Sequence, residues 1–370
     1  MTRSSLHSID PINKKGHYLK AYLQSFGVRI DHTVERRTGG AGPAEGITLV
    51  MNGRSATIPT GCDFVSKSPY TIQSTNGSQI LFKNDYPLSE VNIPDPPRFY
   101  RLSTNDDIPY SKIALLHGSN CLASTVSQTC IHWNSGKKCT FCGIELSLMS
   151  GATLAKKSPQ QLLEVAKVAS ELDGVQHITL TTGAQVDSVD EIQHLSACCS
   201  CIKSETTLPI HVQLMPPSDL KGLEQLKMAG VDTVGIHIES FDFDVLKRVA
   251  PNKAEKDLMD YMSVWKEAVN IFGFNQVSSF IIVGLGERKE SVIEGVALLC
   301  ELGVYPFIVP LRPIPGTPFA SHSPPHPDEM IPIYQHTSSL LKRHGLSWRN
   351  SKAGCVRCGA CSALPDFEDA

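Results

Sequence analysis

The stretch Ser158–Thr182, SPQQLLEVAKVASELDGVQHITLTT, contains one complete helix followed by one buried strand. Ser158 is a favourable N-cap, a proline suits the first helical position, and Gln161 completes a capping box. Apolar residues then recur at helical spacing until Gly174, a residue type that favours the left-handed conformation at helix ends. The run His177–Thr182 is short and rich in β-branched residues, which is typical of a buried strand.

Strand and helix patterns alternate from about Leu115 onward, and Ser218–Gly230 repeats the sequence of cap, amphipathic helix and terminal glycine. Such alternation predicts a parallel sheet with right-handed crossovers. We therefore predict an α/β fold, a partial (βα)6 TIM-type barrel, with a doubly wound open sheet as the alternative. In either fold, functional groups lie at the carboxyl ends of the strands. The predicted strands are Cys121–Gln128, His177–Thr182, Ile210–Leu214, Thr233–Ile238, Gln276–Val283 and Tyr305–Pro310.

The first hundred residues follow a different pattern, which predicts a small α+β domain over residues 1–110. A short amphipathic helix over His17–Phe26 precedes two hairpins, whose tight turns are Asn52-Gly53 and Asn76-Gly77. The Gly-rich stretch Gly39–Pro43 lies between the helix and the hairpins and is expected to be a plain loop. Prolines at 94, 96 and 97 mark the boundary. The barrel is assigned to residues 111–325, and a C-terminal helix with a cysteine-containing tail to residues 326–370.

Composition excludes several classes of protein. The chain has 370 residues, 41% of them hydrophobic and 19% charged, which is enough apolar material for a large core. Its net charge of −3, with acids and bases mixed, argues against a nucleic-acid partner held by bulk electrostatics. No apolar run is long enough to cross a bilayer, and the N-terminal segment has no secretory pattern. The prediction is a cytoplasmic protein with no membrane or nucleic-acid partner.

Cysteines form the first candidate site. The chain has twelve, and in a reducing compartment clustered cysteines indicate metal or redox chemistry. Cys130 follows the first predicted barrel strand, eight residues separate it from Cys139, and two separate Cys139 from Cys142. Three thiolates on one loop can hold three irons of a [4Fe–4S] cluster and leave the fourth iron open to a chelating ligand. We predict a catalytic cluster on these three residues.

A structural zinc site is the alternative interpretation of this loop. Zinc favours sulfur and imidazole ligands, and His132 lies between the first two cysteines. A zinc site would be oddly placed at the mouth of a βα barrel, where catalytic groups gather. Cysteines buried only for packing are not expected in a polar loop that contains Gly and Lys. The position in the barrel therefore favours the iron–sulfur cluster.

The second candidate site is the tail Cys355-Val-Arg-Cys358-Gly-Ala-Cys361, with two residues between successive cysteines. This ferredoxin-like spacing predicts a second [4Fe–4S] cluster, with zinc as the alternative because only three ligands are evident. Cys121 is a weak candidate for the fourth ligand. A second cluster would transfer electrons, bind substrate or donate sulfur. The cysteines in Cys198-Cys199-Ser200-Cys201 are instead expected to pack inside a helix.

The loop end Cys139-Thr-Phe141-Cys142 resembles the cysteine–any–aromatic–cysteine end of the radical SAM loop, although the spacing before it is usually three residues. That resemblance implies S-adenosylmethionine as cofactor, chelated to the open iron beside Phe141. Further motifs are similar in their order along the barrel. By this resemblance, Thr181-Thr182-Gly183 stands where the amino group of S-adenosylmethionine binds, and Glu239 where its ribose hydroxyls bind.

Two later segments extend the resemblance. Gly284 and Gly286 lie in a segment similar to the glycine motif that lets backbone approach adenine, and Pro313–Pro318 is similar to a turn of biotin-synthase-like members. Arg312, just after the sixth predicted strand, is a candidate for binding a carboxylate of substrate or cofactor, because guanidinium binds carboxylates in a bidentate manner. A salt bridge at the rim of the barrel explains Arg312 equally well.

Over nearly its full length the chain resembles the radical SAM proteins of bacterial nitrilase gene clusters associated with cyanide assimilation. The matching segments are Arg36-Arg37, Gly39–Pro43, Pro97–Tyr100, Lys112–Gly118, the eight-residue cysteine spacing and Lys352–Cys355 with the rest of the tail. The resemblance implies reductive cleavage of S-adenosylmethionine to a 5′-deoxyadenosyl radical, which abstracts hydrogen from a small-molecule substrate. A flavodoxin or ferredoxin would supply the electron. The alternatives are a non-catalytic iron–sulfur carrier or scaffold and a zinc-dependent barrel hydrolase. Substrate binding or sulfur donation by the second cluster would resemble the use that lipoyl- and biotin-synthase-like enzymes make of theirs.

Overall fold

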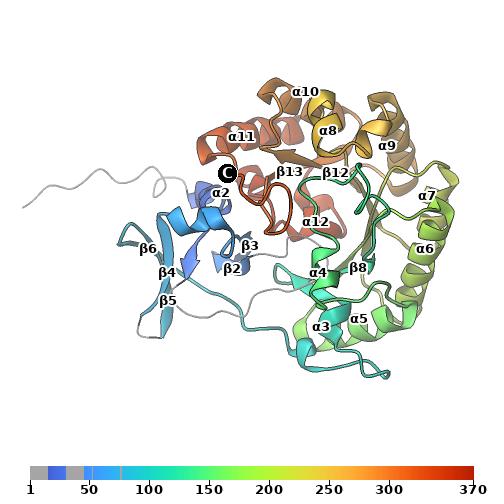
Figure 1. Cartoon of the computed structure of the whole chain (residues 1–370), viewed down its shortest axis with the longest axis horizontal. Helices are drawn as coiled ribbons and strands as arrows, with labels where there is room; N and C mark the ends of the chain where they lie inside the picture. The colour runs from blue at the N-terminus through green and yellow to red at the C-terminus, as the bar shows by residue number, and fades with distance from the viewer. Residues whose placement is uncertain (1–15, 31–45, 52, 76) are drawn as a thin grey trace, which may run out of the picture.

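The computed structural model describes residues 16–30, 46–51, 53–75 and 77–370. Its largest element is a curled seven-stranded sheet that forms a half-barrel (Figure 1). Six strands run parallel from β8 to β13, and β7 pairs with β8 in the antiparallel direction. The strands are β7 (Leu115–His117), β8 (Cys121–Ser127), β9 (His177–Thr182), β10 (Ile210–Leu214), β11 (Thr233–Ile236), β12 (Val277–Val283) and β13 (Val304–Pro310).

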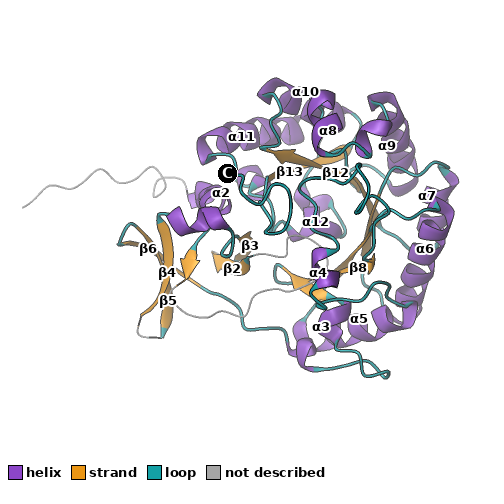
Figure 2. Ribbon diagram, viewed as in Figure 1, coloured by secondary structure: helices purple, strands orange, loops and turns teal. Residues whose placement is uncertain are grey.

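Each of the six predicted strand segments overlaps one of the strands β8 to β13. Every residue of β8 and β11 is buried, which is expected of parallel strands covered on both faces. Helices pack around the outer face of the half-barrel, as Figure 2 shows in purple. The helices after β8 are α4 (Leu146–Met149), α5 (Pro159–Asp173), α6 (Ser188–Glu205), α7 (Lys221–Met228), α8 (Phe243–Val249), α9 (Leu258–Phe272), α10 (Lys289–Glu301) and α11 (Pro327–His344).

Helix α5 begins and ends where the sequence predicts. The Ser158 side chain accepts a hydrogen bond from the Gln161 N–H, the reciprocal bond of the capping box is present, and Gly174 is left-handed. The prediction for the next capped helix is wrong at its start, because α7 begins at Lys221 and has no side-chain cap. The Ser218 hydroxyl contacts the Ser188 hydroxyl instead, 3.1 Å away. The Ser218 side chain, which the local sequence pattern predicts to cap the helix, thus makes a tertiary contact instead.

The N-terminal region has its own small core, built from α2 (Leu19–Phe26) and two sheets. Both predicted hairpins are present: Met51 pairs with Arg54 across one turn, and Thr75 with Ser78 across the other. The Gly39–Pro43 stretch and Arg36-Arg37 lie outside the described residues. The strands here are β1 (Arg29–Ile30), β2 (Ile47–Met51), β3 (Arg54–Ile58), β4 (Tyr70–Thr75), β5 (Ser78–Lys83) and β6 (Tyr86–Val91), and α3 (Tyr110–Ile113) follows.

The C-terminal tail returns to the half-barrel. After α11 the chain forms α12 (Gly354–Cys358) and α13 (Leu364–Glu368). Figure 1 shows α12 within the curve of the sheet, where it contacts β9, β10 and β13. Helix α13 packs instead against α11 and the N-terminal segment around Tyr18. The tail thus lies inside the barrel and between the barrel and the N-terminal region.

Candidate functional site

Cys130 follows β8 and lies at the carboxyl end of the parallel strands. Its backbone N–H donates a 2.9 Å hydrogen bond to Glu145 Oε1, and the next residue, Ile131, donates through its N–H to the Ala184 carbonyl. Ala184 comes directly after β9 and Gly183. The start of the cysteine loop is therefore held by the neighbouring strand end, where polar groups of parallel barrels gather.

Gly183 determines how closely the loop and β9 can approach. A Cβ at this position would overlap the Thr129 carbonyl oxygen, so only glycine fits without moving the backbone. The Gly183 N–H donates to the Ser127 carbonyl at 2.8 Å. Thr181 and Thr182, the other members of the predicted motif, are half-buried at the end of β9. The structure thus brings the predicted Thr181–Gly183 motif against the cysteine loop.

Cys139 and Cys142 form the second half of the loop. The Cys139 Sγ donates to Asn252 Oδ1 at 3.2 Å, and the Thr140 N–H donates to the Val249 carbonyl at 2.8 Å. Both acceptors lie at the end of α8 or just after it. Phe141 is half-buried and packs against the main core. The loop is therefore held by two separate parts of the barrel, β9 and the segment after α8.

The three thiols are close enough to affect one another's charge. Burial raises the pKa of Cys139 to about 12, with smaller increases from the thiols of Cys142 and Cys130. Burial likewise raises the pKa of Cys142 to about 11, and Cys130 adds to that rise. Without a bound cation the thiols of Cys139 and Cys142 therefore stay protonated, and metal binding must displace their protons.

A single metal ion needs several ligand side chains that converge on one point. Within the described part of the chain, no three or more His, Cys, Asp or Glu side chains converge closely enough to hold one. A [4Fe–4S] cluster makes a different demand, since each thiolate binds its own iron and the sulfur atoms stand apart. Three half-buried cysteines on one loop fit that arrangement better than they fit a mononuclear zinc site, which needs convergent ligands.

A buried ion pair lies beside Cys139. Lys253 Nζ is 2.6 Å from Glu239 Oε2 and also donates to the His237 carbonyl at 2.7 Å. Burial alone would lower the pKa of Lys253, but the Glu239 carboxylate reverses this and raises it. The backbone of Glu239 is left-handed, with φ of 64°, a strained conformation that accumulates at functional sites.

Lys253 and Asn252 are functional candidates that the sequence did not reveal. They lie in a short segment after α8 with no motif of their own. Only the tertiary structure brings them to Cys139, whose pKa the Lys253 ammonium lowers. Glu239, which the sequence did single out, contacts Lys253 and lies 7% exposed near the same thiol.

The glycine motif after β12 is folded on itself. The N–H groups of Gly284 and Leu285 donate to the two carboxylate oxygens of Glu287, at 2.8 and 2.7 Å. Gly284 and Gly286 both have positive φ, 105° and 98°, which explains why glycine occupies both positions. A Cβ at Gly284 would lie 2.9 Å from Pro325 Cδ. The motif is therefore a tight turn whose first two amides are already bound.

Arg312 points to the N-terminal region. Its Nη2 donates to the Thr57 carbonyl of β3 at 3.0 Å. In the same area Cys62 Sγ contacts the Pro313 carbonyl at 2.9 Å. Arg312 thus joins the segment after β13 to the N-terminal hairpin. The structure does not bring it to the cysteine loop through any of these contacts.

The second group of cysteines lies at the opposite end of the strands from the first. The Gly354 N–H donates to His177 Nδ1 at 3.3 Å, and His177 is the first residue of β9. The Thr233 hydroxyl, at the start of β11, donates to the Ala353 carbonyl at 3.4 Å. The Gln213 amide donates to Cys355 Sγ at 3.3 Å. The first two contacts place the start of α12 at the amino ends of the parallel strands, and the third reaches Gln213, near the carboxyl end of β10.

The N-terminal region holds this tail in place. Lys20 Nζ donates to the Gly359 carbonyl at 2.7 Å, and Gln24 Nε2 donates to the Ala360 carbonyl at 3.0 Å. The Thr57 N–H of β3 donates to the same Ala360 carbonyl at 2.8 Å. All three bonds join residues more than 300 positions apart in the chain. The N-terminal region therefore covers the tail that carries the second cysteine group.

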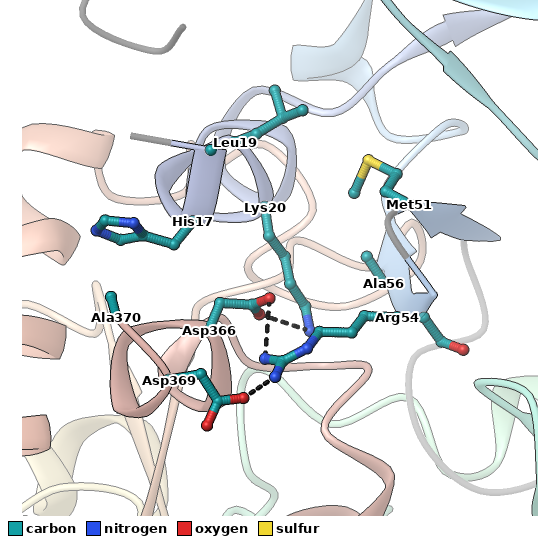
Figure 3. Close-up of a pocket in the computed structure, with 11 residues that line it drawn as sticks. His17, Leu19, Lys20, Met51, Arg54, Ala56, Asp366, Asp369 and Ala370 are labelled. Atoms are coloured by element: carbon teal, nitrogen blue, oxygen red, sulfur yellow. Dashed lines mark hydrogen bonds and ion pairs between the residues drawn. The ribbon is translucent and has the colours of Figure 1, made fainter. Parts of the chain in front are cut away.

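A pocket of about 250 Å³ lies at this contact (Figure 3). Figure 3 shows Lys20 and Arg54 pointing toward Asp366 and Asp369 across it. Lys20 Nζ and Arg54 Nη1 each lie 3.3 Å from an Asp366 oxygen, and Arg54 also pairs with Asp369. Its charged groups are thus paired with one another, which fits an inter-segment contact better than a ligand site.

The chain is similar to several known proteins. Residues 136–299 match the Radical SAM superfamily. The chain is 25% identical to "Bacteriochlorophyllide c C-7(1)-hydroxylase" of Chlorobaculum limnaeum over 362 residues, which cover 90% of this chain and 86% of that one. It is 24% identical to an uncharacterized protein of Methanocaldococcus jannaschii over 189 residues, 50% of this chain and 48% of that one.

Among solved structures, methylornithine synthase is similar with a TM-score of 0.45 and 16% identity, over 58% of this chain and 60% of that one. The chain thus spans less than two-thirds of that protein and about half of the archaeal relative. Within the part of the chain that the structure describes, no helix has both the length and the apolar character needed to cross a bilayer.

Proposed function

We propose that Cys130, Cys139 and Cys142 hold the catalytic [4Fe–4S] cluster of a radical SAM enzyme, since residues 136–299 match the Radical SAM superfamily. The observation that carries this proposal is the loop itself. Its three thiols lie together at the carboxyl end of β8, where burial raises the pKa of Cys139 and Cys142, and the loop is held there from two sides. No fourth cysteine belongs to this loop, which leaves one iron for S-adenosylmethionine.

When bound, the cluster and S-adenosylmethionine supply an electron and a 5′-deoxyadenosyl radical that abstracts hydrogen from a small-molecule substrate. The chain's own residues orient and screen these groups. Glu145 holds the backbone of Cys130, and Asn252 accepts from the Cys139 thiol until a bound iron displaces its proton. The buried Lys253 ammonium beside Cys139 offsets negative charge on the thiolates. Such second-shell groups tune a cluster and fix its ligands.

The proposed contacts to S-adenosylmethionine surround this loop. The cofactor's amino group is assigned to the Thr181–Gly183 end of β9, because Gly183 packs directly against Thr129 of the loop. The ribose is assigned to Glu239, whose carboxylate lies near Cys139 and is oriented by Lys253. The remaining proposed cofactor contacts are Phe141, Gly284, Gly286 and Arg312.

A second [4Fe–4S] cluster is proposed on Cys355, Cys358 and Cys361, for electron transfer, substrate binding or sulfur insertion. Its support is the two-residue spacing and the amide hydrogen bond from Gln213 to Cys355. The proposed domains are residues 1–110, 111–325 and 326–370, the barrel being the middle one in sequence. We further propose that the enzyme is cytoplasmic and takes its electron from a flavodoxin or ferredoxin. The resemblance to proteins of nitrilase gene clusters implies a biosynthetic role beside a nitrilase.

The curated relative from Chlorobaculum limnaeum supports carbon–hydrogen activation as the reaction class. Its name describes hydroxylation at a carbon of bacteriochlorophyllide c, and the match extends over 90% of this chain. We propose hydrogen abstraction from carbon for this chain, with a substrate of its own.

The test is anaerobic reconstitution with iron and sulfide, reduction with dithionite, and addition of S-adenosylmethionine. The expected product is 5′-deoxyadenosine, and Cys130→Ala abolishes it. Cys201→Ala is the matched control, because Cys201 is half-buried on α6, outside both cysteine groups, and it retains product formation. An intact cluster without 5′-deoxyadenosine would instead identify an iron–sulfur carrier or scaffold. A colourless protein with stoichiometric zinc would identify a zinc-dependent hydrolase.

A further inference from the structure

Cys121 is the first residue of β8 and belongs to neither cysteine group by sequence. Its side chain is 1% exposed and lies 3.3 Å from the Thr179 hydroxyl of β9. The thiol of Cys358 is a near neighbour of the Cys121 thiol, and Cys355 also lies near it. A cysteine from the barrel wall thus meets two cysteines of the tail.

The contact is built into the backbone on both sides. Gly118 lies in the turn between β7 and β8, and a Cβ there would lie 2.9 Å from Cys358 Sγ. Gly354 has φ of 88°, and a Cβ there would overlap the imidazole of His211 on β10. Both positions need glycine because any side chain would push the tail away from the strands. The barrel is therefore shaped to receive the tail's thiols next to Cys121.

The sulfur atoms of Cys355 and Cys121 lie beside polar groups that can donate hydrogen bonds to a thiolate. The Gln213 amide donates to Cys355 Sγ at 3.3 Å, and the Thr179 hydroxyl lies beside Cys121 Sγ. Hydrogen bonds to cluster sulfur stabilise the charged form and tune the reduction potential. A cysteine that served only to fill the core would have no use for such neighbours.

The remaining cysteines outside the two groups have other surroundings. Cys62 Sγ contacts the Pro313 carbonyl, and Cys300 lies on α10. Cys198, Cys199 and Cys201 lie on α6, on the outer face of the half-barrel. Cys121 is thus the cysteine of the barrel that the fold brings to the tail.

We propose that Cys121 is the fourth thiolate of the iron–sulfur cluster on Cys355, Cys358 and Cys361, and that it closes this cluster to substrate. The inference rests on the second cluster of the proposed function. Four thiolates occupy all four irons, so no iron is left open for a substrate. Of the three roles proposed for the second cluster, a closed site favours one-electron exchange with an external donor such as a flavodoxin or ferredoxin.

The experiment uses the full chain with Cys130, Cys139 and Cys142 all changed to Ala, so that only the tail cluster is observed. After anaerobic reconstitution this parent is expected to hold about four iron atoms per chain. Its reduced electron paramagnetic resonance spectrum is expected to stay unchanged when cyanide is added, because every iron already has a thiolate. Adding Cys121→Ala is expected to lower the iron content to about three per chain or to make the spectrum respond to cyanide.

Cys199→Ala is the matched control, since Cys199 is also fully buried but lies on α6. It should retain the iron content and spectrum of the parent. A Cys121→Ala variant indistinguishable from the parent would overturn the role of Cys121 alone, as would a parent whose spectrum responds to cyanide. A folded parent without iron would overturn the second cluster itself. If the parent does not fold, Mössbauer spectra of ⁵⁷Fe-reconstituted wild type and Cys121→Ala give the same comparison.

Discussion

The loop that carries Cys130, Cys139 and Cys142 and the tail that carries Cys355, Cys358 and Cys361 differ in how their sulfur atoms are surrounded. The loop lies at the carboxyl ends of the strands beside the Lys253–Glu239 ion pair, with three cysteines. The tail lies at the amino ends, meets Cys121 of β8, and is covered by the N-terminal region.

With the two clusters that we propose, this difference would separate two kinds of iron–sulfur site within one barrel. Three thiolates and buried polar groups suit a cluster that must leave an iron open for a cofactor. A fourth thiol and close backbone packing suit a cluster that only exchanges electrons. The predictions below change one site and ask whether the other is affected, from the largest expected effect to the smallest.

Removing one thiol from each site gives the largest contrast. Cys139→Ala is expected to abolish formation of 5′-deoxyadenosine, because S-adenosylmethionine loses the cluster that reduces it. Cys355→Ala is expected to keep at least uncoupled cleavage, measured by chromatography of reactions under dithionite. Equal loss in both variants would mean that the two sites do not act separately.

Lys253→Met tests the ion pair beside the loop. The change leaves the Glu239 carboxylate buried without its partner, which is expected to cost about 3–5 kcal/mol in unfolding free energy. Denaturant unfolding of the cluster-free protein measures this loss. Lys247→Met is the control, because Lys247 and Asp244 are 67% and 93% exposed and 3.6 Å apart. Its expected cost is below about 1 kcal/mol. Similar losses in both variants would contradict a buried role for Lys253.

Gly183→Ala and Gly354→Ala test the backbone contacts of the two sites. Each adds a methyl group where none fits, at a cost of about 1–3 kcal/mol. Gly183→Ala should lower the yield of 5′-deoxyadenosine, whereas Gly354→Ala should lower the iron content and spare cleavage. Gly136→Ala is the control, because Gly136 lies in the cysteine loop and a Cβ there would meet no other atom within 4 Å. It should change neither the 5′-deoxyadenosine yield nor the iron content. A loss of cleavage in Gly354→Ala would link the two sites.

Gln24→Ala should give the smallest effect. It removes one hydrogen bond to the Ala360 carbonyl, which still accepts from the Thr57 N–H, so the expected cost is about 1 kcal/mol. Faster loss of tail iron to a chelator, with unchanged 5′-deoxyadenosine formation, is the expected result. Gln160→Ala, at an exposed position of α5, should behave like wild type. An unchanged rate of iron loss in Gln24→Ala would mean that this bond does not hold the tail.

Much of the fold could be predicted because its signals are local. The capping box at Ser158 and Gln161 and the left-handed Gly174 depend on a few neighbouring residues. The hairpin turns at Gly53 and Gly77 are also local, and both strand registers follow from them. The predicted start of α7 was wrong. The Ser218 hydroxyl contacts the Ser188 hydroxyl, which lies 30 residues earlier in the chain and so outside any local capping pattern.

The sequence by itself determined which cysteines group together, because their spacing is a property of the chain alone. It also determined that Cys130 follows a strand end, since strand and loop are adjacent in sequence. Only the tertiary structure decided that the two groups face opposite ends of the strands. The reason is that α12 reaches β9 and β10 through contacts between residues far apart in the chain.

The same distinction applies to Cys121 and Lys253. Cys121 was a weak candidate in the sequence because more than two hundred residues separate it from Cys358, and no spacing rule extends that far. The register of β8 and the return of the tail bring the two thiols together. Lys253 likewise has no motif, and burial of its ammonium beside Glu239 and Cys139 becomes evident only once α8 is packed against the barrel.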